Sequence, residues 1–189
     1  MVSQLKVNEI IKQSGSSITI GESGDTINIG TTGDTVNLAG SAYAAASNTP
    51  YFSVRQTGSV TVTDNTDTKV AWNSELVDSD SAFASDKFTV PSDKAGKYFL
   101  YTMTLGRASS NSNLNVYYLN LYKNGSRIAM SENDLRGNAG RKVTSCVNTI
   151  QDLAAGDYIE VYVSVDINAG TAHYDGCDFQ AMFGVFKLL

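Results

Sequence analysis

The stretch KFTVPSDKAGKYFLYTMTL, residues 87–105, decides the fold expected for this chain. Its FTV segment favours a strand, which Pro91 ends because proline has no backbone N–H to donate. The residues SDKAG then have the composition of a tight turn. The strand that follows is apolar on both faces, with Tyr98 and Leu100 on one side and Phe99, Tyr101, Met103 and Leu105 on the other. Both faces must therefore be covered, one by the core of a β-sandwich and the other, we expect, by a neighbouring subunit.

The composition indicates an all-β protein with one domain of ordinary size and an appendage. Of the 189 residues, 42% are hydrophobic and 17% are charged, and ten Tyr and seven Phe occur against two Pro. The net charge of −5 argues against a nucleic-acid partner, which needs clustered Lys and Arg. No apolar run approaches the ~20 residues of a membrane span, and the N-terminus lacks the apolar core of a signal peptide. We therefore expect no membrane insertion, and synthesis in a cytoplasm without secretion.

A nine-residue repeat occupies residues 17–41, as SITIGESGD, TINIGTTGD and TVNLAGSA. Each unit begins with a four-residue alternating strand, and Gly-Asp turns the chain between units. Two apolar side chains per unit cannot form a core alone, so such repeats are stable only when stacked or intertwined. We predict a β-repeat stalk in a homotrimer, whose interface includes Ile18, Ile20, Ile27, Ile29, Val36 and Leu38.

The repeat also resembles the calcium-binding nonapeptide of secreted toxins, G-G-x-G-x-D-x-U-x, in which U is apolar. It departs from that pattern because Asp25 and Asp34 directly follow a Gly and the doubled Gly is missing. A calcium turn needs carboxylate and carbonyl oxygens arranged around the cation. A structural turn is therefore favoured over a calcium site, and we expect no metal and no cofactor.

Three further segments complete the expected organisation. Residues 1–16 form an arm whose apolar side chains have no core of their own and need a partner surface, namely Leu5, Val7, Ile10 and Ile11. Residues 42–50 are small and polar and form a linker. The head, residues 51–189, is predicted to hold about ten short strands without helical periodicity, as in a sandwich or barrel. These strands are expected at 51–54, 59–62, 69–72, 88–90, 97–105, 114–122, 127–130, 142–150, 158–165 and 179–189, with a polar crossing at 76–86.

Four segments of the head together resemble a known family. They are KFTVPSDKAGKYFL (87–100), LYKNG (121–125), LAAGDYIEVYV (153–163) and FQAMFGVFKLL (179–189). In order and spacing they resemble the jelly-roll domain of the complement C-one-q globular head and the tumour-necrosis-factor superfamily. The resemblance implies a ten-stranded, all-β jelly-roll sandwich that packs around a three-fold axis. On that basis Tyr98, Leu100 and Phe186 are expected at the trimer interface.

The first 49 residues resemble other proteins. LKVNEI, SGSSITIG and GDTVNLAG are similar to the N-terminal part of fibre and appendage proteins of tailed bacteriophages, particularly marine ones. This resemblance implies a location on the virion, where residues 1–16 anchor the chain to other virion proteins.

Three polar loops are the candidates for recognition, since loops on a rigid sandwich commonly carry binding residues. They are RASSNSN (107–113), SENDLRGNAGR (131–141) and NAGTAHYDGCD (168–178). The candidate contact residues are Arg107, Ser109, Asn111, Asn113, Glu132, Asp134, Arg136, Arg141, Asn168, His173, Tyr174 and Asp175.

No catalytic residues are predicted. His173 is the only histidine, and it lies in a predicted exposed loop without a nucleophile signature. Cys146 and Cys177 are the only cysteines, and free thiols are favoured over a disulfide.

These observations favour a non-enzymatic bacteriophage structural protein, a trimeric fibre or spike with a jelly-roll knob on the tail or capsid. The knob would contact a host cell-surface glycan or protein. Two alternatives remain, a capsid-decorating and stabilising protein without a receptor role and a cellular trimeric lectin-like binding protein. A depolymerising enzyme is disfavoured by the poverty of catalytic residues.

Overall fold

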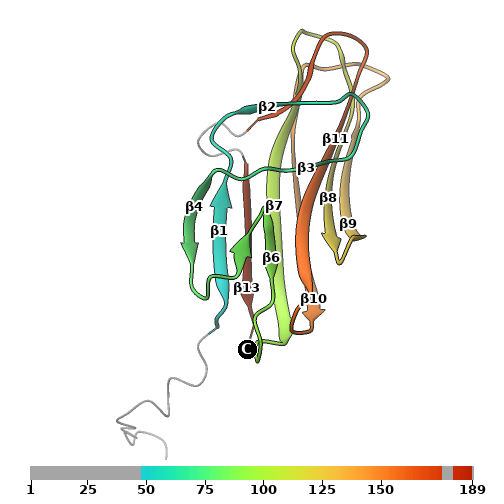
Figure 1. Ribbon diagram of the computed structural model, residues 1–189. Helices are drawn as coiled ribbons and strands as arrows, with labels where there is room; N and C mark the ends of the chain where they lie inside the picture. Colours follow the sequence, from blue (N-terminus) through green and yellow to red (C-terminus); the bar gives the residue numbers. More distant parts are fainter. Residues whose placement is uncertain (1–47, 176–180, 189) are drawn as a thin grey trace, which may run out of the picture. The chain divides into compact units, whose positions relative to one another are not determined.

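The computed structural model describes residues 48–175 and 181–188, and all the regular elements in this part of the chain are β-strands (Figure 1). The chain divides into two units, Met1–Ala45 and Ala46–Leu189, and the described residues all belong to the second, which includes the predicted head, residues 51–189. The strands are β1 (Tyr51–Arg55), β2 (Ser59–Val62), β3 (Thr68–Lys69), β4 (Ser74–Asp78), β5 (Phe83–Ala84), β6 (Lys87–Thr89), β7 (Gly96–Ala108), β8 (Leu114–Lys123), β9 (Ser126–Asp134), β10 (Lys142–Leu153), β11 (Tyr158–Ile167), β12 (Ala172–Asp175) and β13 (Met182–Lys187).

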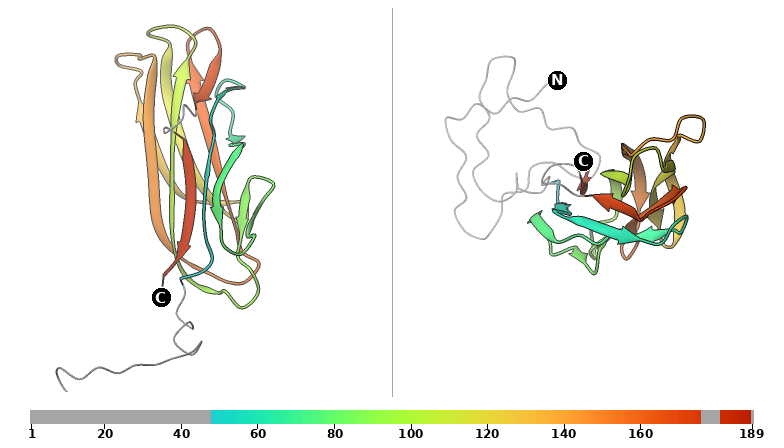
Figure 2. Two further views of the ribbon diagram at one scale, coloured as in Figure 1. Left: turned by 90° about the vertical axis from the view of Figure 1, so that its left-hand side faces the viewer. Right: turned by 90° about the horizontal axis from the view of Figure 1, so that it is seen from above.

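The thirteen strands form two antiparallel sheets that pack face to face (Figures 1 and 2). The seven-stranded sheet has the order β2-β12-β7-β13-β1-β4, and β10 pairs with the other edge of β7. The six-stranded sheet has the order β5-β6-β11-β8-β9, and β3 pairs with β11. The expectation of an all-β, two-sheet head is confirmed.

Strand β7 is the centre of the seven-stranded sheet. Its thirteen residues pair with β10 along one edge, and with β13 and then β12 along the other. Strand β6 lies in the opposite sheet, where it pairs with β11, so the turn after Pro91 carries the chain from one layer to the other. The hydroxyl of Tyr98 donates to the carbonyl of Lys94 and fixes this turn.

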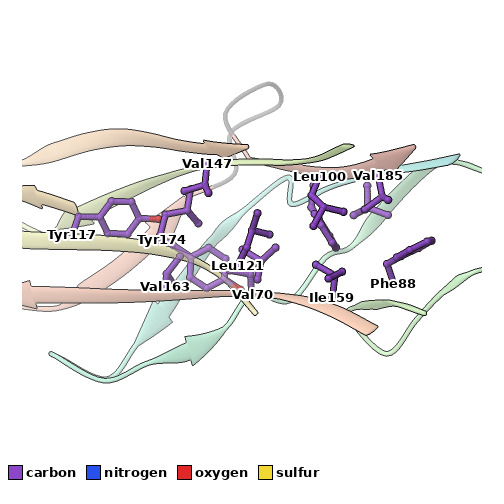
Figure 3. Close-up of a cluster of buried hydrophobic side chains, with 14 of the residues drawn as sticks. Val70, Phe88, Leu100, Tyr117, Leu121, Val147, Ile159, Val163, Tyr174 and Val185 are labelled. Carbon is purple, nitrogen blue, oxygen red and sulfur yellow. The ribbon is translucent and has the colours of Figure 1, made fainter. Parts of the chain in front are cut away.

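The core lies between the sheets, where alternate residues of the long strands meet (Figure 3). Leu100 and Val185 come from the seven-stranded sheet, and Leu121, Ile159 and Val163 come from the six-stranded sheet. All five are fully buried. Period-two alternation in these strands places the apolar residues on the inner face.

The strand count of the head is higher than the ten that were predicted. Strands β4 and β5 lie in residues 76–86 and just before them, which were expected to be a polar crossing, and β12 lies in an expected loop. Strand β4 pairs only with β1, at the edge of its sheet, and its side chains are exposed or half-buried. An edge strand of this kind needs few apolar residues, and the sequence pattern therefore does not reveal it.

The strand predicted at 69–72 is limited to Thr68–Lys69. The N–H of Val70 still bonds to β11, but the next two N–H groups turn to side chains, although the segment VAW is apolar. The N–H of Val70 donates to the carbonyl of Val161 at 2.9 Å, that of Ala71 to the Tyr174 hydroxyl at 2.9 Å, and that of Trp72 to Asp86 Oδ1 at 2.7 Å. Two of these partners are side chains, which a strand prediction from propensity does not consider.

The Asp157 carboxylate joins two turns at the end of the head that also holds Pro91. It accepts from Ala154 N at 2.8 Å and from Asn124 Nδ2 at 2.7 Å, and it pairs with Lys123 Nζ at 2.9 Å. The hydrogen bonds from Lys123, Asn124 and Ala154 lower the pKa of Asp157 to about 2.

This network predicts a loss of stability in acid. A carboxyl whose folded-state pKa lies below its unfolded value of about 3.9 stabilises the fold above that value. That contribution is lost as the pH falls from about 4 through about 2. We expect the melting temperature of Asp157→Asn to fall less over this range than that of the unmodified chain, as thermal unfolding from pH 5 to pH 2 will show. Equal pH dependence of the two proteins would contradict this role.

Candidate functional site

The outer face of the seven-stranded sheet carries a row of large apolar side chains. The register places Tyr51 opposite Phe186, Phe186 opposite Phe99, and Phe99 opposite Ile150, so the row crosses β1, β13, β7 and β10. Ile150 is 58% exposed, Tyr51 43% and Phe186 38%. The ring centroids of Phe99 and Phe186 are 5.1 Å apart. We call these four residues the apolar row.

A second row on the same face consists of Tyr101, Gly184 and Ser53. The hydroxyl of Tyr101 on β7 donates to Ser53 Oγ on β1 at 3.2 Å, which takes its ring across Gly184 on the intervening strand β13. A Cβ atom at Gly184 would lie 2.2 Å from the Tyr101 hydroxyl oxygen. Glycine at this position is therefore required by the close approach of the ring.

The structure corrects two of the predicted interface residues in this sheet. Tyr98 and Leu100 have no exposed surface within the single chain, and both belong to the core between the sheets. Period-two alternation separates the two faces of β7 but does not say which one points inward. The outward face carries Phe99, Tyr101 and Met103, while Phe186 is 38% exposed on the outer surface of the same sheet.

The residues of the apolar row that sequence reasoning missed are Tyr51, Phe99 and Ile150. The sequence could have revealed Phe99, because it lies on the second apolar face of the strand at residues 97–105. Ile150 ends a predicted strand with polar neighbours, and only its register with Phe99 reveals its place in the row.

Residues 107–113, 131–141 and 168–171, which belong to the three predicted recognition loops, come together at one end of the head, at the top of Figure 1. Asn168 N donates to the carbonyl of Asn113 at 2.8 Å, and Asn115 Nδ2 donates to Asn168 Oδ1 at 2.8 Å. Ser109 N donates to the carbonyl of Thr171 at 2.9 Å. Main-chain hydrogen bonds thus hold the β7–β8 loop against the β11–β12 loop. The exposed candidates at this end are Ser109, Asn111, Arg136, Arg141 and Asn168.

Several predicted loop residues lie in strands instead. Arg107 belongs to β7, Glu132 and Asp134 belong to β9, and His173 and Asp175 belong to β12. Asp134 still faces solvent, and its ion pair and hydrogen bonds with Arg136 lower its pKa to about 2. The β9 prediction was too short because polar side chains occupy its exposed end.

Tyr174 is a core residue, which corrects its assignment as a recognition residue. It has no exposed surface, and its hydroxyl accepts from Ala71 N at 2.9 Å. Residues 172–175 alternate as in a strand, because Ala172 and Tyr174 are buried while His173 and Asp175 are half-buried. This pattern is only four residues long. So short a pattern is easily taken for a loop.

His173 and Asp175 do not form a catalytic relay. The Asp175 carboxylate pairs with Arg107 Nε, while His173 Nδ1 lies 3.3 Å from Thr61 Oγ1 and 3.5 Å from Ser59 Oγ. A nucleophile–histidine–acid site needs the acid to orient the imidazole. Burial and the Arg107 guanidinium lower the pKa of His173.

The described residues hold neither a cluster of metal ligands nor a membrane-spanning helix. No group of three or more His, Cys, Asp or Glu side chains in residues 48–175 and 181–188 is placed to hold a metal ion. Within the same ranges, no helix has the length and apolar character needed to cross a membrane.

Other predicted residues lie outside the described part of the chain. These are the arm residues Leu5, Val7, Ile10 and Ile11, and the stalk residues Ile18, Ile20, Ile27, Ile29, Val36 and Leu38. Cys177 also lies outside it, whereas Cys146 is exposed on β10.

Comparison with known proteins identifies the fold. No protein family matches the chain, and no curated protein sequence matches it. Among solved structures, the chain is similar to the globular domain of the zebrafish complement 1qA protein, with a TM-score of 0.53 and 16% sequence identity. The match covers 74% of this chain and 98% of that domain. The expected complement-like jelly-roll sandwich is confirmed at the level of fold.

Proposed function

We propose that the chain is a non-enzymatic structural protein of a bacteriophage virion, assembled as a homotrimer through the apolar row of the head. The observation that supports assembly is the row itself, in which Ile150, Tyr51 and Phe186 are well exposed beside Phe99. A contiguous apolar surface on one face of a sheet commonly marks a protein–protein contact. A second copy of the same chain is the partner, because closed symmetric assembly is the commonest arrangement of soluble oligomers.

The place of the protein on the virion is supported by its N-terminal sequence. The arm and nine-residue repeat resemble those of phage fibre and appendage proteins, and the repeat needs neighbouring chains to bury its isoleucines. In this arrangement residues 1–16 hold the trimer to other virion proteins, residues 17–41 form the stalk, and the loop end of the head contacts a glycan or protein of the host surface.

Assembly is tested by placing charge in the apolar row. The double variant Ile150→Glu and Phe186→Glu buries two carboxylates in any contact through this face, which is strongly unfavourable. Static light scattering at micromolar concentration should give three times the chain mass for the unmodified protein and one chain mass for the variant.

The matched control for this variant is Met130→Glu. Met130 is 44% exposed on β9 of the other sheet, and its replacement should leave the trimer intact. The proposal would be wrong if the unmodified chain were a stable, folded monomer, or if the double variant remained trimeric.

Attachment to the virion is tested by deleting residues 1–16. The shortened chain should still assemble, yet it should be absent from purified particles of the phage that encodes it. Recovery of the shortened chain with the particles at the level of the full chain would rule out the arm as anchor.

The role of the loop end is tested on intact particles. Replacing residues 109–113 should preserve incorporation and reduce adsorption to host cells. The second candidate function, capsid decoration, is favoured instead if such particles adsorb normally and lose DNA under mild heating.

A further inference from the structure

A polar pocket lies on the outer face of the six-stranded sheet. Its volume is about 450 Å³, and its lining comes from Asn65, Thr66 and Asp67 on one side and from Tyr118, Asn120, Arg127 and Ser164 on strands β8, β9 and β11. A volume of this size lies within the range of small-molecule sites. None of its lining residues belongs to the recognition loops or to the apolar row, so its function is separate from those proposed above.

Asn120 gives the pocket its chemical character. It points to the outer face of β8, where its neighbours in register are Tyr162 on β11 and Met130 on β9. It has no exposed surface, and neither its Oδ1 nor its Nδ2 has a hydrogen-bond partner among residues 48–175 and 181–188. A buried amide without partners costs free energy that an apolar residue would not cost. An asparagine here is therefore expected to serve a ligand rather than the stability of the fold.

The wall of the pocket is fixed before any ligand binds. Residues 65–67 form one wall. Asn65 N donates to the carbonyl of Val165 at 2.9 Å, and Ile167 N donates to Asp64 Oδ1 at 2.9 Å, so these hydrogen bonds hold the wall against β11. The hydroxyl of Tyr122 donates to Asp67 Oδ2 at 3.0 Å and orients that carboxylate. A site whose groups are already oriented loses little entropy on binding.

The remaining groups offer both donors and acceptors. Asp67 is exposed and supplies a carboxylate acceptor, while Arg127 is exposed and makes no hydrogen bond or ion pair to the described part of the chain. Ser164 adds a hydroxyl, and Tyr118 adds a half-buried aromatic ring at the pocket.

We infer that this pocket binds one unit of a neutral saccharide, with Asn120, Asp67 and Arg127 hydrogen-bonded to its hydroxyl groups and the Tyr118 ring against its C–H face. Each sugar hydroxyl can both donate and accept, and the mixture of amide, carboxylate and guanidinium matches that requirement. One acid and one base leave the lining without net charge, which favours a neutral ligand over an anionic one.

Other ligand classes fit the pocket poorly. An extended peptide could not add to the sheet at this point, because β8 is already paired with β11 and β9 on its two edges. Nucleic acid needs several cationic contacts to phosphate, and the pocket has a single Arg.

The test uses the full chain and a panel of glucose, galactose, mannose, rhamnose and N-acetylglucosamine, each observed by saturation-transfer NMR. At least one sugar should respond, and Asn120→Leu and Asp67→Ala should each weaken its binding at least tenfold. Leu76→Ala, on edge strand β4 of the other sheet, is the control and should leave the affinity unchanged, because Leu76 lies in neither the pocket nor the recognition loops. Absence of any response to the panel, or a response unaltered by both pocket variants, overturns the inference.

Stability separates a ligand-binding role of Asn120 from a structural one. Because leucine removes the unpaired amide, Asn120→Leu should raise the melting temperature by at least about 2 °C while it abolishes binding. A lowered melting temperature would show that the amide supports the fold, and that result would count against the inference. If Asn120→Leu destabilises the head, Asp67→Ala still tests binding, because Asp67 lies in an exposed loop and its replacement should leave the head folded. Retained binding in the monomeric Ile150→Glu, Phe186→Glu variant would distinguish this site from trimer assembly.

Discussion

A chain that ends at Gly184 is expected to lose the folded head altogether. Strand β13 lies between β7 and β1, and the truncation removes its second half, Val185 to Lys187. Val185 is fully buried, and burial of such a side chain is worth about 1.5–3 kcal/mol. Each ladder hydrogen bond lost adds about 0.5–1.5 kcal/mol, while a typical domain has only about 5–15 kcal/mol of stability.

The measurement is thermal unfolding followed by circular dichroism. The truncated chain should show no cooperative transition, whereas a chain that ends at Leu188 should melt like the full protein. The Leu188 control keeps all of β13, including the hydrogen bond from Lys187 N to the carbonyl of Pro50 at 3.1 Å. A cooperative melt of the shorter chain at the temperature of the full protein would mean that β13 is not a central strand.

Phe52→Ala is expected to give the largest loss of stability among single substitutions of the aromatic core. The Phe52 ring centroid lies 5.2 Å from Phe83, 5.2 Å from Phe88 and 4.9 Å from Phe183. These rings come from both sheets, so removal of Phe52 leaves a cavity at their junction. Truncation of a buried phenylalanine costs about 3–5 kcal/mol, which corresponds to about 10 °C or more in a domain of this size.

The matched control is Leu76→Ala on edge strand β4, where the side chain is 49% exposed. Its effect should stay within about 0.5 kcal/mol. Both variants are compared at one protein concentration, since binding between chains raises apparent stability by mass action. Equal melting temperatures for the two variants would show that the aromatic cluster does not contribute more to stability than an exposed leucine.

Sequence patterns predicted the regular part of the fold because local chemistry dictates it. Strand β2 has the bounds that its alternation predicts, and the turn between β8 and β9 lies at Asn124-Gly125. Both of these residues have a positive φ, at 51° and 77°, as an Asn-Gly hairpin turn requires. Long strands with apolar alternation, such as β11, carry the same kind of local information.

Features that depend on tertiary contact could not be predicted in this way. The inward direction of Tyr98 is decided by the opposite sheet, and the existence of β12 depends on its pairing with β2 and β7. The pocket around Asn120 is hidden for the same reason. Its strand reads as LNLY, an ordinary alternation, and only the loop at 65–67 makes the asparagine part of a pocket.

The chain enters and leaves the head at one end, with Pro50 beside Lys187 and Leu188 bonded to Lys97, while the recognition loops occupy the other end (Figure 1). If the loops hold a cell surface and the stalk holds a particle, drag on the particle pulls along the length of β1. The hydrogen bonds from β1 to β13 then carry the load in shear, so several must break together rather than one after another. On the proposed assembly, strand order would therefore make the head resist unfolding in the direction in which a tethered particle pulls.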